Sequence, residues 1–304
     1  MHTMRYRDSG LIIPVHTAVA GRMRLQVYRP DGRCRQDTGW FDNLVTDAGL
    51  NMMGTGGTLN ACQVGSGTAA PAVTDTSLAS FVAGTTNIEG TVKSTSGADP
   101  HFGATTRRYR FPQGDAAGNL SEVGIGIGAV NGDLLFSRAL ITDGSGTATT
   151  ITVLADEFLD VTYQIQIVPP TTDTTLQVTD SGPAGTVHDI VVRAVAVTQT
   201  GDGNNFGWAT FGDAVTWGSA QLSNSALDPI TGSVGGGLIS MTADAYVNDS
   251  LERTGDLFRG LNDSNIAGGI TRMNFYAPSG GGAWQCSFDP AIPKTDTDTL
   301  TLSV

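Results

Sequence analysis

The chain has 304 residues, which is long for one small β domain and enough for two modest ones. Its 40 glycines, abundant Thr and Val, and only 15% charged residues favour short strands joined by tight turns over long helices. The net charge of −12 repels phosphate backbones, so a nucleic-acid partner is not expected.

The N-terminal region is the one basic part of this acidic chain. Residues 1–20 read as an arm, and seven arginines fall within the first 35 residues. Such a segment favours a polar strand face that pairs with the acidic remainder of the chain or with a neighbouring subunit. The candidate docking residues are Arg5, Arg7, Arg22 and Arg24.

The first clear strand runs from Arg22 to Tyr28, where apolar and polar residues alternate with a period of two. A Pro-Asp-Gly turn and a return segment ending at Phe41 predict a hairpin. A helix is expected from Asp42 to Met53, and a second short one from Thr74 to Val82, because both begin with capping residues.

Glycine-rich turns separate a series of further strands, which predicts an antiparallel meander or sandwich. The expected strands are 105–111, 121–127, 133–141, 149–153 and 160–168. Pro169 and Pro170 and a Thr/Asp-rich stretch then interrupt the series, so we expect a domain boundary near residue 170. Later strands are expected at 186–198, 238–247, 271–277, 283–288 and 297–304.

These elements predict a mainly β fold of two antiparallel β-sandwich-like domains, with one or two short helices in the first. The expected organisation is an N-terminal arm (1–20), a first β domain (21–170) and a distal β-sandwich domain (171–304). The distal part is the more acidic, because it holds 5 Lys and Arg against 14 Asp and Glu, whereas residues 1–170 hold 12 against 15.

Side chains that could carry chemistry are dispersed. The four histidines and three cysteines show no metal-ligand spacing, so no metal centre and no cofactor are predicted. The carboxylates Asp156, Glu157 and Asp160 could serve a glycosidase, but such closely spaced acids before a strand more often cap a turn. We therefore expect no enzyme. A calcium ion at Asp143 or at the loop 202–205 stays open as an alternative to plain turn chemistry.

An aromatic cluster in residues 201–220 is the best candidate for ligand binding. Phe206, Trp208, Phe211 and Trp217 lie among Gly and Asn, where aromatic rings can stack on sugars or anchor a protein partner. The alternative is that these rings cover the end of the second core.

The few and widely spaced cysteines favour assembly in a reducing cytoplasm. No stretch approaches the roughly 18 apolar residues that a membrane span needs, so no membrane insertion is expected.

Two stretches carry a family resemblance. WFDNLVTDAGL (40–50), followed by VGSGTAAPAVTDTSLASFV (64–82), resembles the opening module of tail-fibre-like and baseplate-associated proteins of tailed bacteriophages. SEVGIGIG (121–128), LFSRALITDGSG, ITVLADEFLDVTYQIQI and the C-terminal IPKTDTDTLTLSV are similar to the same group. The match covers most of residues 37–168 and the C-terminal tail; residues 171–290 carry no such resemblance.

The resemblance implies a structural protein of a virion, assembled in the host cytoplasm as a homo-oligomer of three copies with other virion proteins. It also implies attachment to the host, through a surface glycan or a protein receptor. A capsid decoration or head-fibre protein is the alternative within this class. A polysaccharide-degrading tailspike is the alternative of another class, although the sequence lacks a β-helix repeat.

Overall fold

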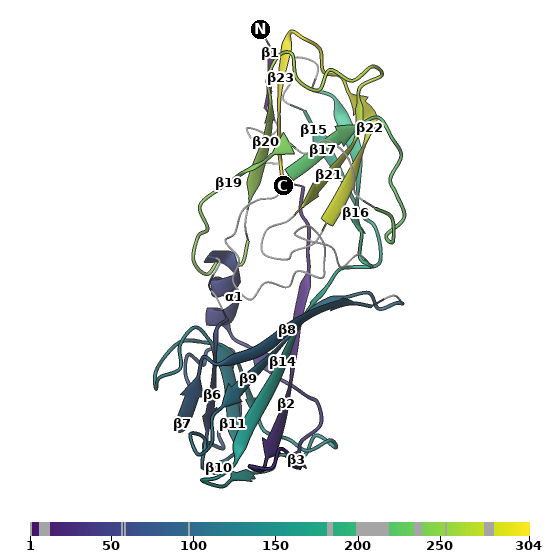
Figure 1. Cartoon of the computed structure of the whole chain (residues 1–304). Coiled ribbons are helices and arrows are strands. Elements are labelled where there is room, and N and C mark those ends of the chain that lie inside the picture. Colours follow the sequence, from purple (N-terminus) through teal and green to yellow (C-terminus); the bar gives the residue numbers. More distant parts are fainter. Residues whose placement is uncertain are drawn as a thin grey trace.

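The computed structural model describes residues 2–5, 13–55, 57, 59–96, 98–180, 185–198, 219–233, 239–252, 254–276 and 283–304. Side chains are described from Ile13 onward, except that of Ser219. The fold is mainly β, as predicted, with one helix and several antiparallel sheets among these residues. The sheets form two groups, at the two ends of the view in Figure 1.

The largest sheet of the first group has the order β3-β2-β14-β9-β8, with β4 also paired to β2. Its two longest strands, β2 and β14, pair antiparallel from Tyr28 opposite Phe158 to Ala18 opposite Val168. Met23, Leu25 and Val27 of β2 are buried, so the predicted alternation is confirmed. The strands are β2 (Ala18–Tyr28), β3 (Cys34–Asp37), β4 (Phe41–Asp42), β8 (Ile88–Thr95), β9 (Gly103–Phe111) and β14 (Phe158–Val168).

A second sheet of this group has the order β5-β12-β11-β6-β7. Its strands are β5 (Leu44–Val45), β6 (Ala61–Gly65), β7 (Phe81–Thr85), β11 (Glu122–Gly126) and β12 (Leu135–Leu140). A short pair, β10 (Gly118–Leu120) with β13 (Ile151–Val153), lies beside them. Both larger sheets contribute to one buried apolar cluster, for example Leu25 and Val161 from one sheet and Val123 and Phe136 from the other.

The helix α1 covers Asp47–Thr55 and begins later than predicted. Residues 41–45 form β4 and β5 instead of a first helical turn. The cap is Thr46, whose Oγ1 accepts a hydrogen bond from the Gly49 amide at 2.9 Å. Thr46 also donates to the Leu135 carbonyl at 2.8 Å, so the cap fixes the helix start against β12.

The second predicted helix, Thr74 to Val82, is wrong. Residues 74–80 form turns and bends, and β7 begins at Phe81. The Asp75 carboxylate accepts from the Ala72 amide at 2.9 Å, and the Thr76 carbonyl accepts from the Leu135 amide at 3.0 Å. The contact with Leu135 holds this irregular segment beside β12, and it overrides the local helical pattern.

The second group of sheets comes mainly from residues 174–304. A six-stranded sheet has the order β15-β16-β22-β21-β17-β18, and a four-stranded sheet the order β1-β23-β20-β19. The first contains β15 (Thr174–Thr179), β16 (Val187–Val195), β17 (Ser219–Ser223), β18 (Ile239–Ser240), β21 (Ile270–Tyr276) and β22 (Ala283–Ile292). The second contains β1 (His2–Arg5), β19 (Thr242–Ala243), β20 (Gly255–Arg259) and β23 (Asp298–Ser303).

The start and the end of the chain pair with each other. β1 lies parallel to β23, and the Ile13 amide donates to the Ser303 carbonyl at 3.3 Å. Residues 2–5 therefore belong to the four-stranded sheet, although the sequence predicts a separate arm. The division of the remaining chain near residue 170 stays a prediction.

The helix α1 contacts the second group of sheets. Asn51 accepts hydrogen bonds from the Tyr246 hydroxyl at 2.7 Å and the Asp249 amide at 2.8 Å, and it donates to the Asp249 carboxylate at 2.7 Å. One side chain of the helix therefore bonds three groups of two residues in the 244–252 loop, so α1 is one link between the groups; the Thr95 hydroxyl, which donates to the Thr198 carbonyl at 3.1 Å, is another.

Candidate functional site

One face of the sheet formed by β3, β2, β14, β9 and β8 carries four arginines, from β2 and β9. Side chains that alternate with the buried ones point away from the core on β2, β14 and β9. Thr162 of β14 lies opposite Arg24 of β2 and Arg108 of β9, so the two arginines flank it. We call this surface the outer face; its members are Arg22, Arg24, Gln26, Thr106, Arg108, Arg110, Asp160, Thr162 and Gln164, with Asp37 of β3.

The two predicted docking residues on β2 have partners on this face. Arg22 donates from Nε to Gln164 Oε1 at 2.9 Å, and its guanidinium lies 4.6 Å from the centroid of the Trp40 ring. Arg24 donates from Nε to Asp37 Oδ1 at 2.9 Å. The Arg24 guanidinium lowers the pKa of Asp37 from 3.8 to about 2, because its hydrogen bonds stabilise the carboxylate against the cost of burial.

Asp160 is a buried carboxylate that organises the two arginines of β9. Its side chain has no exposed surface, and Arg110 binds it through two hydrogen bonds, each of 2.7 Å. Arg108 lies 3.8 Å from the same carboxylate, and its side chain is 45% exposed. The carboxylate therefore holds two partly exposed guanidinium groups in place on the sheet surface.

Of the other two acids of the predicted trio, Asp156 is exposed and Glu157 is buried with partners different from those of Asp160. Glu157 accepts from Arg35 Nη2 at 2.7 Å and from the Leu154 amide at 3.0 Å. Because Glu157 is bound by Arg35 and Asp160 by the arginines of β9, the arrangement fits structural ion pairs better than a pair of carboxylates across a sugar.

An ion triad with two buried members, Glu122 and Arg138, lies under the loop that follows β6. Glu122 of β11 has no exposed side-chain surface and lies 2.8 Å from Arg138 Nη2 of β12. It also accepts from the backbone amides of Gly67, Ala79 and Ser80 at 3.0, 3.1 and 2.7 Å.

Asp75 is the third member of this triad. Arg138 donates to the Asp75 carboxylate at 2.6 Å. Burial disfavours the ionised form of Asp75, but the hydrogen bonds from Ala72 and Arg138 outweigh it and lower the pKa of the carboxyl. The Glu122–Arg138–Asp75 triad thus fixes the irregular segment 66–80 onto the second sheet.

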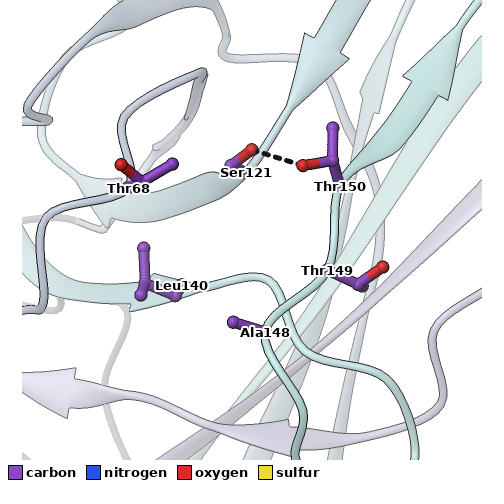
Figure 2. Close-up of a pocket in the computed structure, with 6 residues that line it drawn as sticks. All are labelled: Thr68, Ser121, Leu140, Ala148, Thr149 and Thr150. Atoms are coloured by element: carbon purple, nitrogen blue, oxygen red, sulfur yellow. Dashed lines mark hydrogen bonds between the residues drawn. The ribbon is translucent and has the colours of Figure 1, made fainter.

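An open pocket of about 400 Å³ lies beside β11 and β12. Figure 2 shows Ser121 pointing toward Thr150, and their hydroxyl oxygens are 2.8 Å apart. The lining residues are Thr68, Ser121, Leu140, Ala148, Thr149 and Thr150. A lining of hydroxyl and small apolar groups can accept water or a small neutral group, but it supplies neither an acid nor a base.

The other predicted site residues fall in different places. Arg5 lies in β1, whereas Arg7 and the aromatic residues Phe206, Trp208, Phe211 and Trp217 lie outside the described residues, as does the loop 202–205.

The calcium candidate Asp143 is engaged in a turn. It accepts from the Ser145 and Thr147 amides at 2.9 and 3.0 Å, which is ordinary turn chemistry. Within the described ranges no group of three or more His, Cys, Asp or Glu side chains is arranged to hold a metal ion. The same part of the chain contains no helix with the length and apolar character of a membrane span.

Sequence reasoning missed the ion triad and the arginines of β9. The alternation Thr106, Arg108, Arg110 within a predicted strand could have indicated the polar outer face. Comparison with protein-family models, with curated proteins and with solved structures finds no significant match to this chain.

Proposed function

We propose that this chain is a structural protein of a tailed-bacteriophage virion, a tail-fibre or baseplate component that serves assembly and host attachment. One observation carries the proposal. Asp75, Glu122 and Arg138 come from three separate segments that resemble the phage module, and they meet in one ion triad. The residues that carry the resemblance therefore include those that stabilise this part of the fold, which suits a protein whose role is structural.

The outer face is the proposed docking surface toward other virion proteins. Arg22, Arg24, Arg108 and Arg110 present partly exposed guanidinium groups on one rigid sheet, and such groups favour contacts with acidic surfaces. The acidic region 171–304, with its aromatic segment 201–220, is proposed to face outward and to contact a host glycan or protein receptor.

Purified particles of a phage that carries this gene would test the role. We expect mass spectrometry to find the chain in the particles, and gold-labelled antibodies to mark the tail tip or fibres in electron micrographs. Label on the head would point to the capsid decoration protein instead. Absence from washed particles, or release of oligosaccharide when the chain is incubated with host capsule, would overturn the proposal.

The docking surface can be tested separately by complementation of a phage that lacks this gene. The variant Arg24→Gln/Arg108→Gln should lower the amount of chain bound to particles, because it removes two positive charges from the outer face. The matched control is Arg33→Gln, since Arg33 has a 79% exposed side chain on the turn between β2 and β3. Equal incorporation of both variants would contradict the assignment of this face.

A further inference from the structure

Arg108 carries an excess positive charge on the outer face. Its side chain is 45% exposed, and its Nε lies 3.8 Å from the buried Asp160 carboxylate. Arg110 already binds both oxygens of that carboxylate, through hydrogen bonds of 2.7 Å. Arg108 itself forms no hydrogen bond with any residue that the structure describes. The carboxylate therefore neutralises one guanidinium group, and the other keeps its charge and its N–H donors available.

Two hydroxyl groups lie near Arg108. Thr162 faces Arg108 across β14 and β9, where the Cβ atoms of facing residues are about 4.5–5.5 Å apart. Tyr28 ends β2; burial is the main cause of its raised pKa, followed by the charges of Cys34 and Asp160. The charge of Arg108 lowers the pKa of Tyr28, so the phenol lies within electrostatic reach of the guanidinium. Neither hydroxyl forms a hydrogen bond within the described part of the chain.

The surface beside Arg108 is open on the side of β8. Gly90 of β8 faces Arg108, and a Cβ atom at this glycine would have no atom within 4 Å other than those of its chain neighbours. Val92, the next residue of β8 on the same face, is 66% exposed. A group from another molecule can therefore approach Arg108 from this side without displacing a side chain.

We propose that Arg108, Thr162 and Tyr28 form a binding site for one carboxylate, an Asp or Glu side chain on the surface of a neighbouring protein. All three groups can donate hydrogen bonds. The planar fork of the guanidinium matches the two oxygens of a carboxylate, and such charge-assisted bonds are the stronger ones.

The local charge selects a ligand with a single negative charge. Arg108 and Arg110 with Asp160 leave one net positive charge, which one carboxylate neutralises. A doubly charged sulfate or phosphate group would leave a negative charge beside Asp160, which is unfavourable. Arg24, on the other side of Thr162, adds no net charge because it is bonded to Asp37.

This site deepens the docking role proposed for the outer face and rests on that role. It replaces a general preference for acidic surfaces with one contact, in which the partner contributes an acidic side chain at Arg108. The hydroxyls of Thr162 and Tyr28 orient that side chain, because they donate from two different strands beside the guanidinium.

An NMR titration of the full chain with N-acetylglutamic acid α-amide tests the site, since this probe carries one side-chain carboxylate. We expect a saturable shift of the Thr162 backbone amide. Arg108→Gln should abolish the shift, and Arg108→Lys, which keeps the charge but lacks the fork, should raise the dissociation constant on the order of tenfold. Tyr28→Phe should raise it about three- to tenfold. The matched control Arg33→Gln removes an exposed arginine elsewhere and should leave it unchanged.

The outcomes separate this site from the proposed function. No saturable shift in the natural chain, or equal dissociation constants for the natural chain and Arg108→Gln, would overturn the site. Sulfate bound more tightly than the probe at equal ionic strength would overturn the choice of a carboxylate. Each of these results leaves the test on purified particles standing. Absence of the chain from particles would overturn the virion role, whereas the titration would still report whether Arg108 binds a carboxylate.

Discussion

Replacing Glu122 by Gln tests whether the ion triad holds the segment 66–80. The Glu122 carboxylate accepts from the Gly67 and Ser80 amides at one oxygen, and from the Ala79 amide and Arg138 at the other. A glutamine NH₂ group cannot accept, so either orientation leaves at least two buried donors without an acceptor. Each costs about 1–3 kcal/mol, and we expect a loss of about 3 kcal/mol in the free energy of unfolding.

Urea denaturation followed by circular dichroism measures this loss. Glu89→Gln is the matched control, because Glu89 is exposed on β8 and its change should stay within about 0.5 kcal/mol. Arg138→Met should also destabilise by about 3–5 kcal/mol, since it leaves Glu122 and Asp75 without their shared cation. A loss below about 0.5 kcal/mol for Glu122→Gln would refute the view that these bonds hold the segment.

Three further predictions concern the helix cap, an ion pair and the thiols. Thr46→Val should cost about 1–2 kcal/mol in urea denaturation, because the Gly49 amide loses its capping oxygen; Thr46→Ser should restore stability. The folded-state pKa of Asp37 is depressed to about 2, so the Arg24–Asp37 pair contributes stability above about pH 4 that is lost as the pH falls toward 2. Arg24→Met should return that pKa toward 3.8, as measured by NMR titration, and an unchanged value would contradict the pairing. Cys34 is exposed and the other two cysteines are buried, so a thiol reagent should modify one group in the native protein and three in denaturant.

The strands that the sequence predicts well are those with one buried and one polar face. In β2 the alternation of Met23, Leu25 and Val27 with polar residues marks the strand, because a strand with one face on a core must repeat with period two. The strand β14 is the same case, and its long register with β2 follows from the match of their buried faces. The local sequence pattern is enough to predict a strand when only one face of that strand packs on the core.

The strand β8 could not be predicted in this way. Its side chains from Ile88 to Lys93 are exposed on both faces, so no hydrophobic period marks it. The pairing with β9 comes instead from the chain turning back after Ser96. The start of α1 was misplaced for a related reason: Asp42 can cap a helix as well as Thr46 can, and only the contact of Thr46 with Leu135 on β12 decides between them.

The Glu122–Arg138–Asp75 triad could not be predicted from any local sequence pattern. Glu122 and Arg138 are separated by 16 residues, and Arg138 and Asp75 by 63, so their meeting depends on the register of β11 with β12 and on the path of the loop after β6. The register places Gly124 opposite Arg138, which makes Glu122 the diagonal neighbour of the arginine on the same face. A shift of one residue would turn Arg138 toward the opposite face of the sheet and leave Glu122 buried without its cation. The triad therefore depends on this register, and its buried charges also disfavour any other register.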